Sequence, residues 1–178
     1  MAATRGLWPD PMIAASKRAE FFDVISSQPM KDLMGSATGV TTASVVECAR
    51  FFRAVDHYPD WHPDVVRRVE VLERDGDGEP SKGRAMLHVA VGPLVKDFDV
   101  VLAVGLPDPH TVSLKRIPNH PGDDERFEVT WTMQEGAQTR LRLVVGASLS
   151  VPRFVPVGGI GDGLAEGFLS AATRALAA

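Results

Sequence analysis

The sequence predicts one α+β domain in which a curved antiparallel sheet of about six to seven strands wraps around a long C-terminal helix. Two patterns lead to this prediction. Between residues 65 and 145, apolar and polar residues alternate along consecutive segments separated by Gly, Asp and Pro turns, as in an antiparallel meander with one buried face. After residue 156, apolar residues recur at every fourth position, as on the buried face of a helix. Because no other long element remains to cover the sheet, the two should pack together.

The composition indicates one globular domain in a reducing compartment. The 178 residues are 44% hydrophobic and 24% charged, with a formal net charge of −4, which allows a sizeable core and lacks the basic excess of a nucleic-acid-binding surface. We therefore expect no nucleic-acid partner. No apolar stretch reaches about 18 residues, so we expect no integral membrane segment. The lone Cys48, interpreted as a buried helix residue, favours a cytoplasmic location.

Residues 1–32 are predicted to form an N-terminal extension, and residues 33–178 the domain itself. Asp10 followed by Pro11 is a helix-start signal, so we expect the extension to be helical as far as about residue 26. We expect this helix to pack on the outside of the domain, and the alternative is a lid or a partner-binding arm.

The domain should begin with a strand over residues 31–40 and a short helix. Ser44 and Glu47 have the spacing of a capping box, which places the start of the helix at Val45. Pro59 and Pro63 should then exclude a continuing helix.

Six further strands and the final helix should follow. The alternating segments are residues 65–74, 83–91, 98–104, 111–117, 127–133 and 141–145. The final helix is expected over about residues 158–176, with a stripe that includes Ile160, Leu164 and Phe168.

The segment between the short helix and the second strand carries a distinctive motif. It reads Tyr58-Pro-Asp-Trp-His-Pro-Asp64, followed by Val69-Glu-Val-Leu-Glu-Arg-Asp75. With the Phe98-Asp-Val-Val-Leu strand, Pro152-x-Phe154 and the alanine-rich C-terminal helix, it resembles the polyketide cyclase/dehydrase and lipid-transport branch of the START-like (SRPBCC) superfamily. The resemblance implies the helix-grip fold, with a deep cavity between sheet and C-terminal helix for hydrophobic ligands. It does not imply one reaction.

Three polar residues are candidates for a catalytic role, each with an alternative. Arg116 could bind an oxyanion in the cavity if it shares a face with Val112 and Leu114, or it could pair with an acidic residue of 123–125 at the sheet rim. His88 could act as a general base, unless Leu87 and Val89 point inward and leave it solvated. Tyr58 could present its hydroxyl at the cavity mouth or bond to backbone.

The predicted cavity lining combines the motif residues with the apolar faces of the strands and the last helix. Trp61 could close over the cavity as a gate or fix the loop as a core anchor. The candidate ligand-binding residues are Tyr58, Trp61, His62, Phe98, Val100, Leu102, Leu114, Phe127, Val129, Trp131, Met133, Leu141, Leu143, Ile160, Leu164 and Phe168.

The resemblance implies a protein that binds a small hydrophobic ligand, such as a polyketide, lipid, quinone or aromatic compound, and that could act as a polyketide cyclase/dehydratase. The alternatives are a non-catalytic lipid or quinone carrier and a protein-interaction module. We expect no metal, because the five histidines are dispersed. We expect no cofactor either, because nucleotide-binding motifs are missing. A homodimer is left open. Two polar residues converging in the cavity would indicate an enzyme, and an almost wholly apolar cavity would indicate a carrier.

Overall fold

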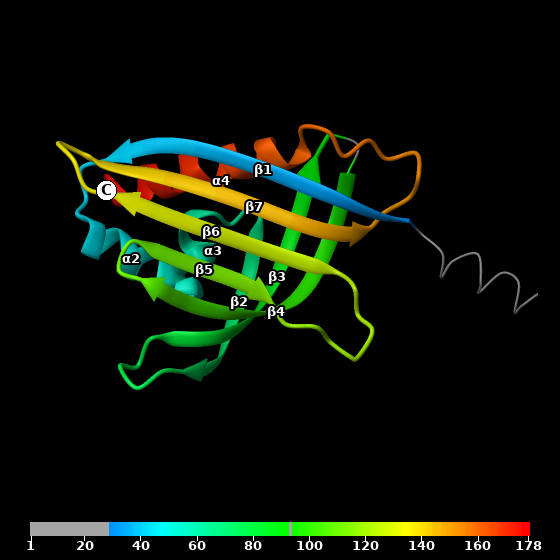
Figure 1. Ribbon diagram of the computed structural model, residues 1–178, viewed down its shortest axis with the longest axis horizontal. Coiled ribbons are helices and arrows are strands. Elements are labelled where there is room, and N and C mark those ends of the chain that lie inside the picture. The colour runs from blue at the N-terminus through cyan, green and yellow to red at the C-terminus, as the bar shows by residue number, and fades with distance from the viewer. Residues whose placement is uncertain (1–28, 93) are drawn as a thin grey trace, which may run out of the picture.

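The structure is a computed structural model that describes residues 29–92 and 94–178, so the helix predicted over residues 10–26 lies outside the described residues. It contains one seven-stranded sheet, three short helical elements and a long C-terminal helix (Figure 1). The elements are β1 (Met30–Thr41), α2 (Val45–Arg53), the single 3-10 turn η1 (Val55–His57), α3 (Tyr58–Trp61), β2 (Val66–Arg74), β3 (Pro80–Val91), β4 (Leu94–Asp108), β5 (Thr111–Arg116), β6 (Arg126–Gln134), β7 (Thr139–Ser150) and α4 (Ile160–Leu176).

The sheet is antiparallel throughout, and it curves around α4. Its strand order is β1-β7-β6-β5-β4-β3-β2. From β2 through β7, strands that are consecutive in the chain are neighbours in the sheet, and the last strand, β7, also pairs with β1. The helix lies behind β1 and β7 in Figure 1 and packs mainly against β1. The predicted curved antiparallel sheet around a C-terminal helix is confirmed.

The start of α2 agrees with the capping-box signal. The backbone N–H of Glu47 donates to the Ser44 hydroxyl oxygen at 3.3 Å, and the backbone N–H of Ser44 donates to the Glu47 carboxylate at 2.7 Å. Two of the N–H groups left over at a helix start are thereby satisfied.

The short helix α2 ends before the Tyr58 motif, as predicted, but the motif itself forms one separate helical turn that was not predicted. The chain breaks at Ala54, makes η1, and forms the four-residue helix α3 with Pro59 in its first turn. Proline is compatible with that position because the N–H it lacks would have no partner inside the helix.

Several strands are longer than their alternation suggested. β3 and β4 pair as far as Val91 and Leu94, on either side of a turn in which Gly92 has φ of 56°. β7 continues to Ser150, which pairs with Met30 of β1. Backbone pairing therefore extends beyond the predicted segments.

Two helices share the concave face of the sheet. α4 covers one part, and α2 packs against β5 and β6 to cover another. Phe52 of α2 stacks on Trp131 of β6 with ring centroids 4.0 Å apart, and both side chains are fully buried. The core is therefore continuous beneath both helices.

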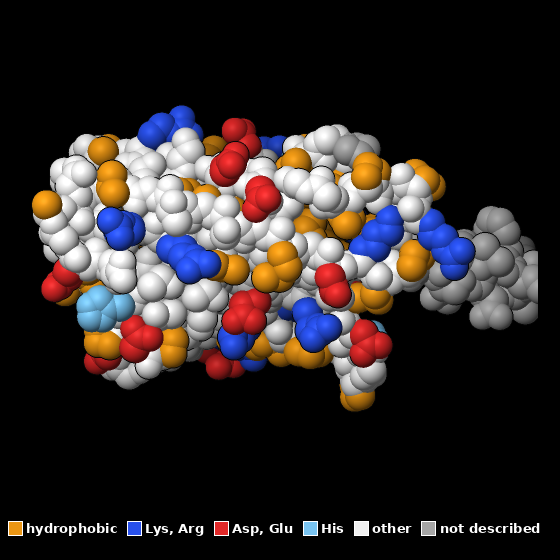
Figure 2. Space-filling model, turned by 45° about the horizontal axis from the view of Figure 1, so that its top comes forward, with side chains coloured by type: hydrophobic (Ala, Val, Ile, Leu, Met, Phe, Trp, Pro, Cys, Tyr) orange, Lys and Arg blue, Asp and Glu red, His pale blue; other side chains and the backbone are white. Residues whose placement is uncertain are grey.

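The outer surface carries charges of both signs. On the face shown in Figure 2, acidic and basic side chains are interspersed rather than gathered by sign. Among the described residues, no helix combines the length and apolar character needed to cross a membrane.

Candidate ligand-binding site

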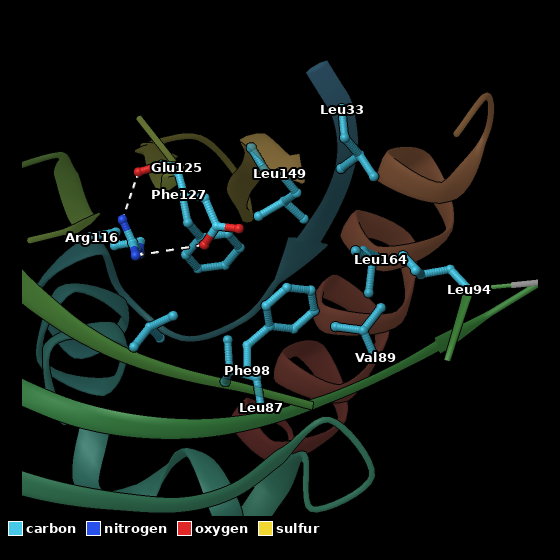
Figure 3. Close-up of a pocket in the computed structure, with 12 residues that line it drawn as sticks. Leu33, Leu87, Val89, Leu94, Phe98, Arg116, Glu125, Phe127, Leu149 and Leu164 are labelled. Atoms are coloured by element: carbon cyan, nitrogen blue, oxygen red, sulfur yellow. Dashed lines mark hydrogen bonds and ion pairs between the residues drawn. The ribbon is translucent and has the colours of Figure 1, made fainter. Parts of the chain in front are cut away.

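Two small apolar cavities lie between the sheet and α4. We name them by one polar lining residue each, the Arg116 cavity of about 40 Å³ and the Tyr58 cavity of about 30 Å³. The Arg116 cavity is lined by Leu33, Leu87, Val89, Leu94, Phe98, Val100, Arg116, Glu125, Phe127, Ala147, Leu149 and Leu164 (Figure 3). The Tyr58 cavity is lined by Val55, Tyr58, Val66, Val69, Gly83, Ala85, Leu87, Leu102, Leu114, Phe127, Val129 and Phe168.

The two cavities are neighbours that share a wall. Leu87 and Phe127 line both of them, while Leu164 and Phe168, about one helical turn apart on α4, line one each. The cavities therefore lie end to end along α4. Small-molecule pockets typically have volumes of roughly 300–1,000 Å³, and each cavity has about a tenth of the lower end of that range. A ligand larger than a few atoms would therefore need the shared wall to move.

The Arg116 cavity forms where β5 ends. Within the described residues, β4 pairs with β5 only from Leu102 onward, so the β4 segment that contains Phe98 and Val100 has no strand on that side. The chain between β5 and β6 folds across this position and brings Glu125 to the cavity wall. The early end of one strand thus leaves the space that these side chains line.

Nine of the predicted lining residues border a cavity, and they are distributed over both cavities. Phe98, Val100 and Leu164 border the Arg116 cavity, and Phe127 borders both. The Tyr58 cavity is bordered by Tyr58, Leu102, Leu114, Val129 and Phe168.

Seven predicted lining residues border neither cavity, and most of them are packed in the core. These residues are Trp61, His62, Trp131, Met133, Leu141, Leu143 and Ile160. For the strand residues among them, the reason is that α2 packs on part of the concave face that the prediction assigned to α4 alone. Ile160 instead packs in a separate part of the core with Leu33 and Val155.

Residues outside the predicted set complete the lining. Leu87 and Val89 belong to the inward face of β3 that the sequence offered as one of two registers. Leu149 was missed because the predicted strand stopped at residue 145, although Ala147 and Leu149 continue the alternation of β7. Glu125 and Leu33 carry no periodic signal that could have identified them.

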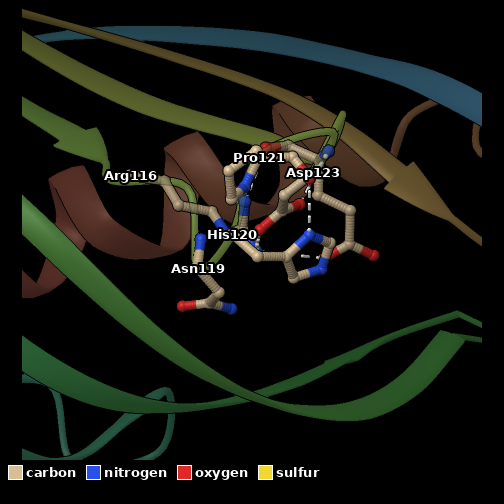
Figure 4. Close-up of polar contacts among 6 residues, drawn as sticks. Arg116, Asn119, His120, Pro121 and Asp123 are labelled. Atoms are coloured by element: carbon tan, nitrogen blue, oxygen red, sulfur yellow. Dashed lines mark hydrogen bonds and ion pairs between the residues drawn. The ribbon is translucent and has the colours of Figure 1, made fainter.

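Arg116 borders the cavity and is also ion-paired with acidic residues of the loop after β5 (Figures 3 and 4). Its side chain is 5% exposed. One guanidinium nitrogen, Nη2, donates to Asp123 Oδ2 at 2.8 Å, and Nη1 donates to the backbone oxygen of Glu125 at 2.7 Å. The Glu125 carboxylate lies 3.6 Å from Nη2.

Asp123 organises the loop that carries this ion pair (Figure 4). Its carboxylate also accepts the backbone N–H of Asn119 at 2.9 Å and that of Glu125 at 3.2 Å. The Arg116 guanidinium, and next the Asn119 N–H, hold the pKa of Asp123 well below its usual range. The loop is therefore fixed by a charge that is present at neutral pH.

The structure places His88 away from both cavities. Leu87 and Val89 point inward and are buried, so His88 lies on the opposite face of β3, where its Nδ1 is 2.6 Å from Asp97 Oδ1. A histidine on this face cannot exchange a proton with a molecule beneath α4.

Tyr58 is a buried wall residue rather than a group at the mouth. Its hydroxyl donates to the backbone oxygen of Phe52 at 2.8 Å, and burial raises the pKa of the phenol far above its usual value. It contributes an apolar ring to the Tyr58 cavity and no proton donor that works near neutral pH.

Trp61 and His62 form a second layer behind the Tyr58 cavity. The centroid of the Trp61 ring lies 4.6 Å from that of the Tyr58 ring and 5.3 Å from that of the Phe51 ring. His62 meets Phe168 edge-on at 4.5 Å, and its burial lowers the pKa of the imidazole. Their link to the cavity is through Phe168 and Tyr58.

Comparison with known proteins agrees with this architecture. Residues 50–176 match the polyketide cyclase / dehydrase and lipid transport family, and the chain belongs to this family. No match was found among curated proteins.

Solved structures share the fold at low sequence identity. A START superfamily protein from Mycobacterium smegmatis has a TM-score of 0.62 at 19% identity, over 80% of this chain and 96% of that one. A protein from Thermus thermophilus has a TM-score of 0.58 at 18% identity, with the same coverage of both chains. The di-domain ARO/CYC StfQ from the steffimycin biosynthetic pathway has a TM-score of 0.54 at 14% identity, over 93% of this chain and 60% of that one.

Proposed function

We propose that this protein binds a small hydrophobic molecule without covalent chemistry, in a site that joins the Arg116 and Tyr58 cavities. The observation that carries this proposal is the shared wall: among the described residues, Leu87 and Phe127 alone border both cavities. Rotation of the Phe127 ring would turn two small voids into one elongated apolar site. Such a site gains affinity from the apolar surface that the ligand removes from water.

A carrier is favoured over a cyclase by the distribution of polar groups. In the part of the chain that the structure describes, the only charged lining residues of the two cavities are Arg116 and Glu125, and both lie at one end. The hydroxyl of Tyr58 is already committed to the backbone of Phe52. A site with polar groups at one end can orient a ligand, but it offers no second group farther along to assist a reaction there.

Cyclisation of a flexible poly-β-ketone is the second candidate, and it rests on the Arg116–Glu125 pair. A guanidinium and a carboxylate side by side could hold an enolate oxygen and take up a proton. Orientation of the chain within the joined site would supply the remaining rate enhancement.

Native mass spectrometry of the purified protein tests the proposal. Binding predicts an added mass that is lost after organic extraction, and the extracted molecule should rebind to the emptied protein at a one-to-one ratio. A carrier returns the molecule unchanged, whereas a cyclase converts a supplied poly-β-ketone into a ring with loss of water. Failure of the emptied protein to bind any hydrophobic probe would contradict both functions and favour a protein-interaction module.

A further inference from the structure

We infer that the ligand carries a neutral hydroxyl group, of an alcohol or a phenol, that donates a hydrogen bond to the Glu125 carboxylate at the polar end of the Arg116 cavity. This inference rests on the proposed function and specifies the class of molecule. It takes the place of one of the two sequence-based alternatives for Arg116, the one in which this residue binds an oxyanion in the cavity.

The charge of Arg116 is already balanced. Two carboxylates, those of Asp123 and Glu125, lie within 2.8 Å and 3.6 Å of its Nη2 atom. With all three groups ionised, the cluster has a net charge of −1. A carboxylate ligand would add a third negative charge beside a single guanidinium.

Asp123 is not free to give up its place to an anion. Its carboxylate holds two backbone N–H groups of the loop as well as Arg116. The pair is buried, with 5% and 7% of the two side chains exposed. An anionic ligand that displaced Asp123 would therefore have to unfold the loop that forms one side of the cavity.

Unlike the carboxylate of Asp123, the carboxylate of Glu125 has oxygen atoms that can accept a further hydrogen bond. Among the described residues, no hydrogen bond reaches either of its side-chain oxygens, and its contact with Arg116 is 3.6 Å. Figure 3 shows its carboxylate between the guanidinium and the cavity, beside the Phe127 ring. A carboxylate in this position accepts from an O–H group and has nothing to donate.

Lys96 is a further cation near this end, and it defines the competing possibility. The Lys96 ammonium is 5.0 Å from the centre of the Phe98 ring and donates to the backbone oxygen of Ser150 at 3.4 Å. Lys96 does not line the Arg116 cavity. An anion held at this lysine would remain outside the space that the apolar residues enclose.

Three probes with one apolar body test the inference, namely 2-naphthol, its methyl ether and 2-naphthoate, each titrated into the full chain at pH 7 by calorimetry. We expect naphthol to bind about tenfold or more tightly than either of the others, as a hydrogen bond to a charged group would give. Glu125→Gln removes the charge and keeps the shape, so the discrimination between naphthol and naphthoate should fall by about tenfold. Glu128→Gln, on the exposed outer face of β6, is the matched control and should change nothing.

The outcomes separate this inference from the proposed function. Equal binding of naphthol and its methyl ether would overturn the hydroxyl assignment while leaving hydrophobic binding intact. Tightest binding of naphthoate, abolished by Lys96→Met, would overturn it and assign the polar end to an anion at Lys96. Binding of none of the three probes would contradict the proposed function itself.

Discussion

Gly35 of β1 and Gly161 of α4 meet backbone against backbone. A Cβ atom added to Gly35 would overlap the backbone of Gly161, and one added to Gly161 would overlap that of Met34. The neighbouring contact fixes the same position, because the backbone N–H of Ser36 donates to Asp162 Oδ1 at 3.1 Å. The first turn of the gripped helix is thus fastened to an edge strand of the sheet.

We predict that Gly35→Ala destabilises the protein by about 1–3 kcal/mol or more, because α4 must shift away from β1 to admit the methyl group. Gly167→Ala is the control within the same helix, since an added Cβ there has no atom within 4 Å. It should stabilise the protein by up to about 1 kcal/mol through helix propensity. Denaturant unfolding measures both changes, and equal effects of the two substitutions would contradict the close contact.

The Asp123 ion pair predicts a specific loss of stability in acid. Because the folded pKa of Asp123 is depressed, its contribution is complete above the unfolded pKa of about 3.9 and is lost as the pH falls through the folded value. The unfolding free energy of the wild type should therefore decline below about pH 5 more steeply than that of Asp123→Asn. Urea unfolding at stepped pH measures this, with the exposed neighbour Asp124→Asn as the control that keeps the wild-type slope.

Trp61 is expected to act as a core anchor rather than as a gate. Its ring packs on Phe51, Tyr58 and Phe168, so Trp61→Ala should destabilise the empty protein by about 3–5 kcal/mol. Trp61→Phe should cost much less, because the buried indole N–H has no hydrogen-bond partner among the described residues to lose. Thermal unfolding of both variants separates the views, since a gate would leave the empty protein unchanged and speed the release of ligand.

The rate at which a reagent modifies the Cys48 thiol measures how closely α2 stays packed on the sheet. Cys48 belongs to α2, and its side chain is fully buried between this helix and the sheet. Burial raises the pKa of the thiol to about 11. A thiol reagent at pH 8 should therefore modify the folded protein very slowly and the denatured protein at once. Rapid modification without denaturant would show that α2 leaves the sheet more easily than the packing implies.

The sheet and the final helix could be predicted because their periodicity is set by burial on one face. Val100 and Leu102 alternate with polar or outward residues along β4, and Leu164 and Phe168 recur at helical spacing on α4. The capping box at Ser44 was equally local. In each case neighbours in the sequence contain the physical cause of the element.

The extent of the cavity could not be predicted, because it depends on contacts between distant segments. Nothing near Trp131 indicates that Phe52 will stack on it and fill that end of the sheet. The sequence offered the acidic residues 123–125 as partners of Arg116, but it did not indicate that Arg116 and Glu125 would both border a cavity. Alternation identifies the face on which a side chain lies, but not whether another helix occupies the space above it.

We claim that a ligand occupies the space between the sheet and α4, and two adjacent substitutions on β4 test this. Val100 lines the Arg116 cavity, whereas Val101 points to the other face of β4. In Val100→Phe the new ring takes up the void, so the dissociation constant of the extracted ligand should rise about tenfold or more. In Val101→Phe it should stay at the wild-type value. Thermal unfolding checks that both variants are folded. Unchanged affinity in folded Val100→Phe would contradict the claim.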